Sequence, residues 1–180
     1  MGIPTLITTN TITSSADSTA FTSGIDSTYD EYMFVWTDVH PSNDGPTLGF
    51  QVNASGQSGY NESISSTFWS ADLNEAGGGG SINYGASWDM GNETTTQYVN
   101  AAVDNDTDSS TSGILHLFSP ADTTSVKHFY SRSHSVYNAT TAQTDFVSGY
   151  VNVAAAIVAV EWKFSLGTID SGVFQMFGIG

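Results

Sequence analysis

Hydrophobic and polar residues alternate along much of the chain with a period of two, which is the pattern of strands that bury one face of a sheet. The clearest segment is 29–39, where Tyr32, Phe34 and Trp36 share one face and the opposite face is also largely apolar. This segment is therefore predicted to be a central strand. Segment 47–54 also alternates, and the proline-containing loop between the two segments predicts that they form an antiparallel pair.

The alternation also assigns individual side chains to the interior or to solvent. In segment 47–54 it predicts that Gln51 faces solvent. In segment 157–165 it predicts two faces. The core face carries Val158, Val160, Trp162 and Phe164, and the solvent face carries Ala159, Glu161 and Lys163.

Shorter apolar runs predict the remaining strands. They cover residues 19–22, 66–73, 94–103, 114–119, 126–137, 145–153 and 173–177. The last of these follows a turn at 167–172 and is expected to close a C-terminal hairpin with the strand before it. Segment 82–92 has no clear period and is predicted to be irregular. Four consecutive glycines at 77–80 predict a mobile loop.

These segments predict an all-β chain of about nine or ten strands, folded as an antiparallel β-sandwich or a jelly-roll-like structure. Residues 1–28 are expected to form an N-terminal arm or one or two edge strands, and residues 29–180 the sandwich itself. A length of 180 residues is that of one domain, so a single domain is expected overall.

Composition supports β structure and excludes several functions. The chain contains 25 Ser, 22 Thr and 18 Gly, but only 3 Lys plus Arg against 18 Asp plus Glu, for a net charge of −15. So acidic a chain is unsuited to nucleic acid or to an anionic membrane surface. No apolar run is long enough for a transmembrane helix, and the first residues lack a signal-peptide pattern. The absence of cysteine excludes thiolate catalysis and disulfides.

Metal and catalytic motifs are weak. Asp104, Asp106 and Asp108 alternate like the start of a calcium loop, but Ser109 and Leu115 stand where an EF-hand needs Gly and Glu. A shallow Ca²⁺ site at the three aspartates is therefore a weak candidate, and we expect no other metal or cofactor. There is no G-x-S-x-G nucleophile motif, and no enzymatic activity is expected.

Three aromatic residues flank the glycine loop. Trp69, Tyr84 and Trp88 stand in a region rich in Asn and Gly. A flat ring beside amide groups suits the apolar face of a sugar, so these residues are candidates for glycan or receptor contact. The alternative is that the rings fill the core beneath long loops.

The sequence also contains segments that resemble a known group of proteins. They lie at 21–34 (FTSGIDSTYDEYMF), 39–41, 50–54, 59–62, 126–129, 149–152 and 167–178 (GTIDSGVFQMFG). In these segments the chain resembles virion structural proteins of marine tailed phages, cyanophages among them. The resemblance covers most of residues 20–180 and is weakest at the glycine loop and at 104–108.

This resemblance implies a non-enzymatic subunit of the phage particle surface, made in the host cytoplasm. The expected role is capsid decoration (cement) or an appendage subunit, with other virion proteins as partners and a homotrimer as one arrangement. The alternative is a receptor- or glycan-binding module of a tail fibre tip. The resemblance supplies no catalytic residues. Few Lys and Arg residues leave few trypsin-type cleavage sites, and a high negative charge opposes clumping of particles.

Overall fold

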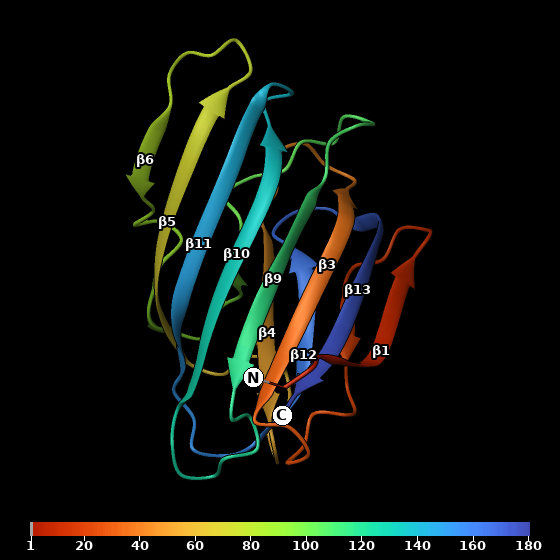
Figure 1. Ribbon diagram of the computed structural model, residues 1–180, viewed down its shortest axis with the longest axis vertical. Coiled ribbons are helices and arrows are strands. Elements are labelled where there is room, and N and C mark those ends of the chain that lie inside the picture. The colour runs from red at the N-terminus through yellow and green to blue at the C-terminus, as the bar shows by residue number, and fades with distance from the viewer. Residues whose placement is uncertain (1) are drawn as a thin grey trace.

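The computed structural model describes residues 2–180 and consists of two antiparallel β-sheets packed face to face (Figure 1). The nine-stranded large sheet lies in front in this view, and β4 and β12 of the four-stranded small sheet are seen behind it. All regular elements of the described residues are strands. Within residues 2–180, no helix meets the length and apolarity needed to span a membrane.

The strand order defines both sheets. The large sheet runs β1 (Thr5–Ile12), β13 (Ile169–Ile179), β3 (Glu31–Pro41), β9 (Thr111–Phe118), β10 (Lys127–Tyr137), β11 (Thr141–Val151), β5 (Ile64–Asn74) and β6 (Ser81–Tyr84), and β7 (Met90–Glu93) also pairs with β5. The small sheet runs β2 (Thr19–Phe21), β12 (Ile157–Phe164), β4 (Leu48–Ala54) and β8 (Gln97–Tyr98).

The predicted all-β antiparallel sandwich is confirmed, whereas a jelly-roll topology is not. Thirteen strands replace the nine or ten expected, because β6, β7 and β8 have four residues or fewer and are too short to show a period. The irregular structure predicted for 82–92 is wrong, since β6 and β7 both pair with β5 there. The strand predicted over 94–103 is reduced to the two residues of β8.

Two predicted strand pairs are also wrong. Strand β3 lies between β13 and β9 in the large sheet, whereas β4 lies between β12 and β8 in the small sheet. Likewise β12 and β13 form no hairpin, because the turn between them carries the chain from one sheet to the other. Strands β3 and β4, like β12 and β13, therefore lie in opposite sheets and are not hydrogen-bonded to each other. Periodicity identifies a buried face but not the hydrogen-bonded neighbour.

The first 28 residues contribute an edge strand to each sheet. Strand β1 pairs with β13, and β2 pairs with β12. Between them, Ala16 forms an isolated bridge to Ile169. The expected edge strands are therefore present, and this segment closes one side of the sandwich across both layers.

Trp162 of β12 is the centre of the aromatic core. Its fully buried ring lies 5.1 Å from that of Trp36 in β3, 5.7 Å from Phe50 in β4 and 5.9 Å from Phe174 in β13. These contacts join both sheets through one side chain. In a chain without cysteine, burial of such large apolar rings is a main source of favourable folding free energy.

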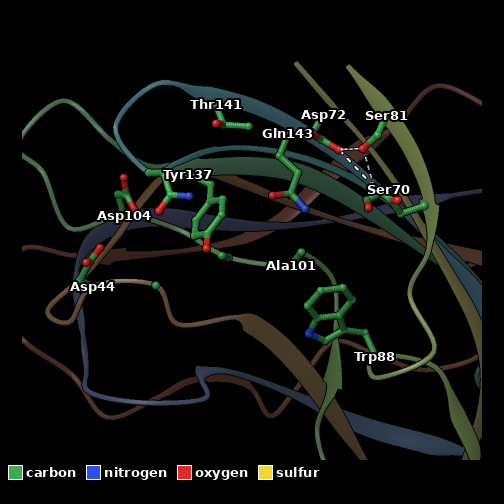
Figure 2. A pocket seen from close by; sticks show the side chains of 14 residues that line it. Asp44, Ser70, Asp72, Ser81, Trp88, Ala101, Asp104, Tyr137, Thr141 and Gln143 are labelled. Carbon is green, nitrogen blue, oxygen red and sulfur yellow. Dashed lines mark hydrogen bonds between the residues drawn. The ribbon is translucent and has the colours of Figure 1, made fainter. Parts of the chain in front are cut away.

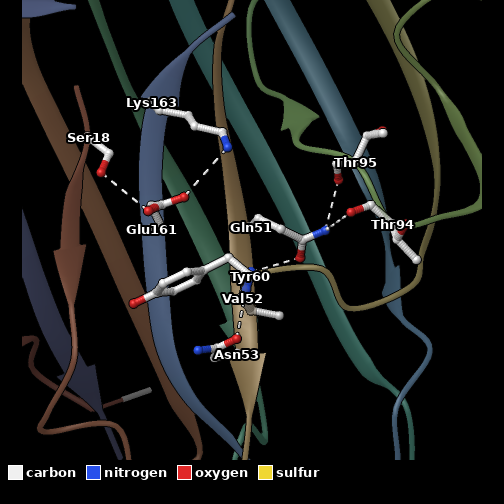
Figure 3. Close-up of polar contacts among 9 residues, drawn as sticks. All are labelled: Ser18, Gln51, Val52, Asn53, Tyr60, Thr94, Thr95, Glu161 and Lys163. Atoms are coloured by element: carbon white, nitrogen blue, oxygen red, sulfur yellow. Dashed lines mark hydrogen bonds and ion pairs between the residues drawn. The ribbon is translucent and has the colours of Figure 1, made fainter. Parts of the chain in front are cut away.

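The small sheet departs from simple alternation in both β4 and β12. Gln51, predicted to face solvent, is buried because its Nε2 donates to the carbonyls of Thr94 and Thr95 in the covering loop (Figure 3). Val158, predicted to lie in the core, is exposed, and Ala159, predicted to face solvent, is buried. A register shift between Ile157 and Ala159 moves the two side chains to the opposite faces.

Candidate functional site

A cavity of about 690 Å³ lies at one end of the sandwich on the inner side of the large sheet. Strands β5 and β11 provide Ser70, Asp72 and Gln143, and Tyr137 ends β10. The loops before β4 and after β8 complete the wall. In Figure 2, Gln143 points into the space between Tyr137 and Trp88. This volume lies within the range of about 300–1,000 Å³ that is usual for small-molecule sites.

Trp88 forms the aromatic wall of the cavity and is held from behind. Its ring packs against the buried ring of Phe68 at 5.2 Å, and its carbonyl accepts a hydrogen bond of 3.0 Å from Gln97 Nε2. The tight turn before it begins at Gly85, where a Cβ atom would lie 2.5 Å from Phe68 and 2.7 Å from the Trp88 ring. Glycine at this position therefore allows the indole to reach the cavity.

Carboxylates line two sides of the cavity. Asp44 lies within hydrogen-bonding reach of Asp104, and this second acid raises the pKa of Asp44. Asp104 also accepts a hydrogen bond from the backbone N–H of Ala139. On the other side, Asp72 accepts hydrogen bonds from the side chains of Ser81 and Asn83. These contacts fix the direction in which each carboxylate points.

A buried acid lies next to the cavity wall. Asp145 of β11 is fully buried, accepts hydrogen bonds from the N–H of Ala101 at 3.0 Å and Gln143 Nε2 at 3.2 Å, and packs away from solvent. Burial raises the pKa of Asp145 to about 6. The hydrogen bond to Asp145 fixes the amide of Gln143, so that its Oε1 is left without a protein partner in the described structure.

The structure brings together only two of the three aromatic candidates. Trp69 and Tyr84 are directly paired residues of β5 and β6 and point to the outer face of the large sheet. The Trp69 ring stacks on Phe146 at 4.0 Å. Trp88 lies on the opposite side of the sheet, in the cavity. The three rings therefore belong to two separate surfaces.

The three candidate calcium ligands also separate. Asp104 lines the large cavity, whereas Asp108 lines a second, shallower hollow beside His40. Asp106 uses its backbone carbonyl to contact His40. Within residues 2–180, no three acidic or histidine side chains are grouped so that they could hold a metal ion.

Sequence reasoning missed Tyr137, Gln143 and Asp44 as site residues. Each stands in a different part of the chain, and Gln143 reads as an ordinary polar position of a strand. One local signal was present in β5. Ser70 and Asp72 are polar but alternate on the same face as the buried Phe68. Polar residues on a core-facing strand indicate a cavity or a buried network.

Comparison of the sequence with protein-family models and with curated proteins, and of the fold with solved structures, finds no match.

Proposed function

We propose that this chain is a non-enzymatic structural subunit of a phage particle, of the virion type that its sequence resembles, and that it attaches to another virion protein through the outer face of its large sheet. The observation that carries the proposal is the composition of this outer face. It combines exposed aromatic and aliphatic side chains with a near absence of carboxylates, in a chain with a net charge of −15.

A row of mostly apolar side chains, three of them aromatic, crosses the outer face from strand to strand. Tyr84, Trp69, Phe146, Arg132 and Ile114 are successive cross-strand partners from β6 to β9. All five side chains are on the same face, because directly paired residues of antiparallel strands point the same way. A contiguous apolar patch of this kind is typical of an interaction surface.

A second row runs parallel to the first. His116 and Tyr130 are paired residues whose rings stack at 4.5 Å, and Met33 is the next partner along the register. Tyr130 is exposed, as is Leu6 at the β1 end of the same row. The apolar surface therefore extends from one edge of the large sheet to the other.

Carboxylates are excluded from the centre of this face. Strands β9 and β10 contain none, and Asp72 and Asp145, the acids of β5 and β11, are on the inner side. Glu31 of β3 lies on the outer face but is paired with His116. Most of the 18 acidic residues thus lie away from the centre of this face, so it can approach a neighbour with little charge repulsion.

Arg132 indicates the chemistry of the partner. Of the three cations, Lys127 is buried and donates to three backbone carbonyls, and Lys163 pairs with Glu161 on the small sheet. Arg132 lies over the Phe146 ring at 5.5 Å and has no ion-pair partner among residues 2–180. A matching surface would offer apolar side chains and one carboxylate opposite Arg132.

The face is large enough for a stable complex. The six strands from β13 to β5 have 8 or 11 residues each. At about 4.8 Å between strands and about 3.3 Å per residue, they span roughly 30 Å in each direction, or roughly 900 Å². This estimate is close to the ~800 Å² that each partner buries in a standard interface.

Mass spectrometry of purified particles from a phage that encodes this chain tests the role, and we expect the chain to be present in many copies. Arg132→Glu is expected to reduce its incorporation strongly. Lys163→Glu is the matched control, because it changes the net charge equally on the small sheet and should leave incorporation unchanged. Particles that lack the chain, or equal incorporation of the two variants, would contradict the proposal. Sedimentation of the isolated chain shows whether it forms homotrimers.

A further inference from the structure

The cavity at the end of the sandwich has the features of a ligand site and is separate from the attachment face. It lies on the inner side of the large sheet, whereas the proposed attachment surface is the outer side of the same strands. Its walls come from residues between 44 and 143 and meet only in the folded chain. Its ligand can therefore be inferred from its own chemistry.

Several polar groups that reach the cavity have no protein partner. Gln143 is 92% buried (8% exposed), its Nε2 is used by Asp145, and its Oε1 has no hydrogen-bond partner among residues 2–180. The hydroxyls of Ser70 and Tyr137 and the indole N–H of Trp88 are equally unpaired within the described chain. None of these atoms is among the fully buried unpaired ones of the described residues, so each opens onto the cavity. Together they offer a bound molecule a set of convergent polar groups beside an aromatic wall, which is typical of a ligand site.

The free groups comprise both donors and acceptors. Gln143 Oε1 accepts, the Trp88 N–H donates, and the hydroxyls of Ser70 and Tyr137 do either. A ligand that satisfies them must itself carry groups that donate and accept, as hydroxyls do. The Trp88 ring and the Tyr137 ring add apolar surface at two sides of the same cavity. A ring with an apolar face and hydroxyls at its rim matches this arrangement.

Electrostatics restricts the ligand further. Asp44, Asp72 and Asp104 line the cavity, whereas none of the chain's Lys or Arg residues does so. An anionic ligand would be repelled by these carboxylates. Asp72 and Asp104 already accept hydrogen bonds from neighbouring donors, and no three acidic or histidine side chains within residues 2–180 are grouped to hold a metal ion. A neutral ligand fits both observations.

We propose that this cavity binds a neutral saccharide, with the Trp88 ring against a pyranose face and Gln143 Oε1, Ser70 and Tyr137 hydrogen-bonded to its hydroxyls. This inference goes beyond the structural role and assigns the glycan contact to Trp88 alone of the three aromatic residues named from the sequence. Trp69 and Tyr84 are on the other side of the sheet and take no part in it.

Isothermal titration calorimetry and tryptophan fluorescence on the full chain test the site. The probes are neutral oligosaccharides of glucose, galactose, mannose and N-acetylglucosamine, with sialyllactose and oligogalacturonate as anionic comparisons. We expect millimolar or tighter binding of at least one neutral probe and none of the anionic ones. Absence of binding to every neutral probe at about 10 mM, or a preference for the anionic probes, would overturn the proposal.

Variants then locate the binding site. Trp88→Ala is expected to weaken binding about tenfold or more, and Tyr137→Phe, which removes a single unpaired hydroxyl, about threefold to tenfold. Trp69→Ala is the matched control on the outer face and should leave binding unchanged. If Trp88→Ala does not fold, saccharide binding by Tyr137→Phe and Ser70→Ala tests the site instead. Unchanged binding in the cavity variants, or loss of binding in Trp69→Ala, would refute the site.

The attachment face and the saccharide site can be refuted independently of each other. Loss of incorporation in Arg132→Glu with retained saccharide binding supports both of them. Release of shorter products from a bound probe would keep the saccharide site but contradict the non-enzymatic role. Particle incorporation in the absence of saccharide binding would overturn only the cavity assignment.

Discussion

Replacing Asp145 by Asn is expected to stabilise the protein at neutral pH and to flatten its pH dependence. The Asp145 side chain is fully buried, and its two hydrogen bonds, from the N–H of Ala101 and from Gln143 Nε2, do not compensate for the loss of water around a charge. Burial therefore raises the pKa of Asp145 from its ordinary value of 3.8 to about 6.

The direction of the pH dependence follows from proton binding by Asp145. Between pH 3.8 and about 6 the folded chain holds a proton on Asp145 that the unfolded chain has released, so the free energy of unfolding falls as the pH rises through this window. The pKa difference of about 2.2 (about 6 − 3.8), at about 1.36 kcal/mol per pKa unit, corresponds to about 3 kcal/mol lost above pH 6. An Asn side chain retains the acceptor for Ala101 and never ionises.

Urea unfolding of the wild-type chain, Asp145→Asn and Asp108→Asn between pH 4 and pH 8 measures the effect. Asp108 is an exposed carboxylate, so Asp108→Asn controls for the change in net charge. We expect Asp145→Asn to match this control near pH 4 and to exceed its stability by up to about 3 kcal/mol at pH 7. A variant that is less stable than the control at every pH, or a difference that does not change with pH, would refute the reasoning.

Two further predictions compare matched positions by urea unfolding. Trp162→Ala is expected to lower the free energy of unfolding by about 3–5 kcal/mol, because it removes the ring that joins both sheets. Trp69→Ala, on the outer face, should lower it by about 1 kcal/mol or less, and equal losses would contradict the assigned core. Gly49→Ala is expected to cost about 1–3 kcal/mol, since its Cβ would lie 2.5 Å from the Thr96 side chain. Gly91→Ala, with nothing within 4 Å, should be neutral; a destabilised Gly91→Ala would show that the close contact is not the cause.

Part of the site could be anticipated from the sequence. Trp88 was named as a candidate because an indole in a Gly- and Asn-rich segment is typical of sugar contact. Trp69 stands in a similar segment but lies on the other face, because successive side chains of β5 point to opposite sides and Trp69 directly follows the buried Phe68. The choice between them required the turn at Gly85, which brings Trp88 back beneath the sheet.

The sequence by itself determined the fold class and the buried faces of the long strands. In β3, the face shared by Tyr32, Phe34 and Trp36 is the buried one, as the alternation predicts, because the geometry of an extended chain is local. It also determined that the protein is acidic. It did not determine which strands pair, where Val158 leaves the alternation, or why Gln51 is buried.

Those features were decided by tertiary structure, because they depend on groups far apart in the chain. Asp44, Asp104 and Gln143 meet at the cavity only once both sheets are assembled. The outer face is free of carboxylates at its centre only because the register sets β9, β10, β11 and β5 side by side. A period of two in the sequence identifies the face that a strand buries. The elements that cover this face depend on the packing of the whole chain.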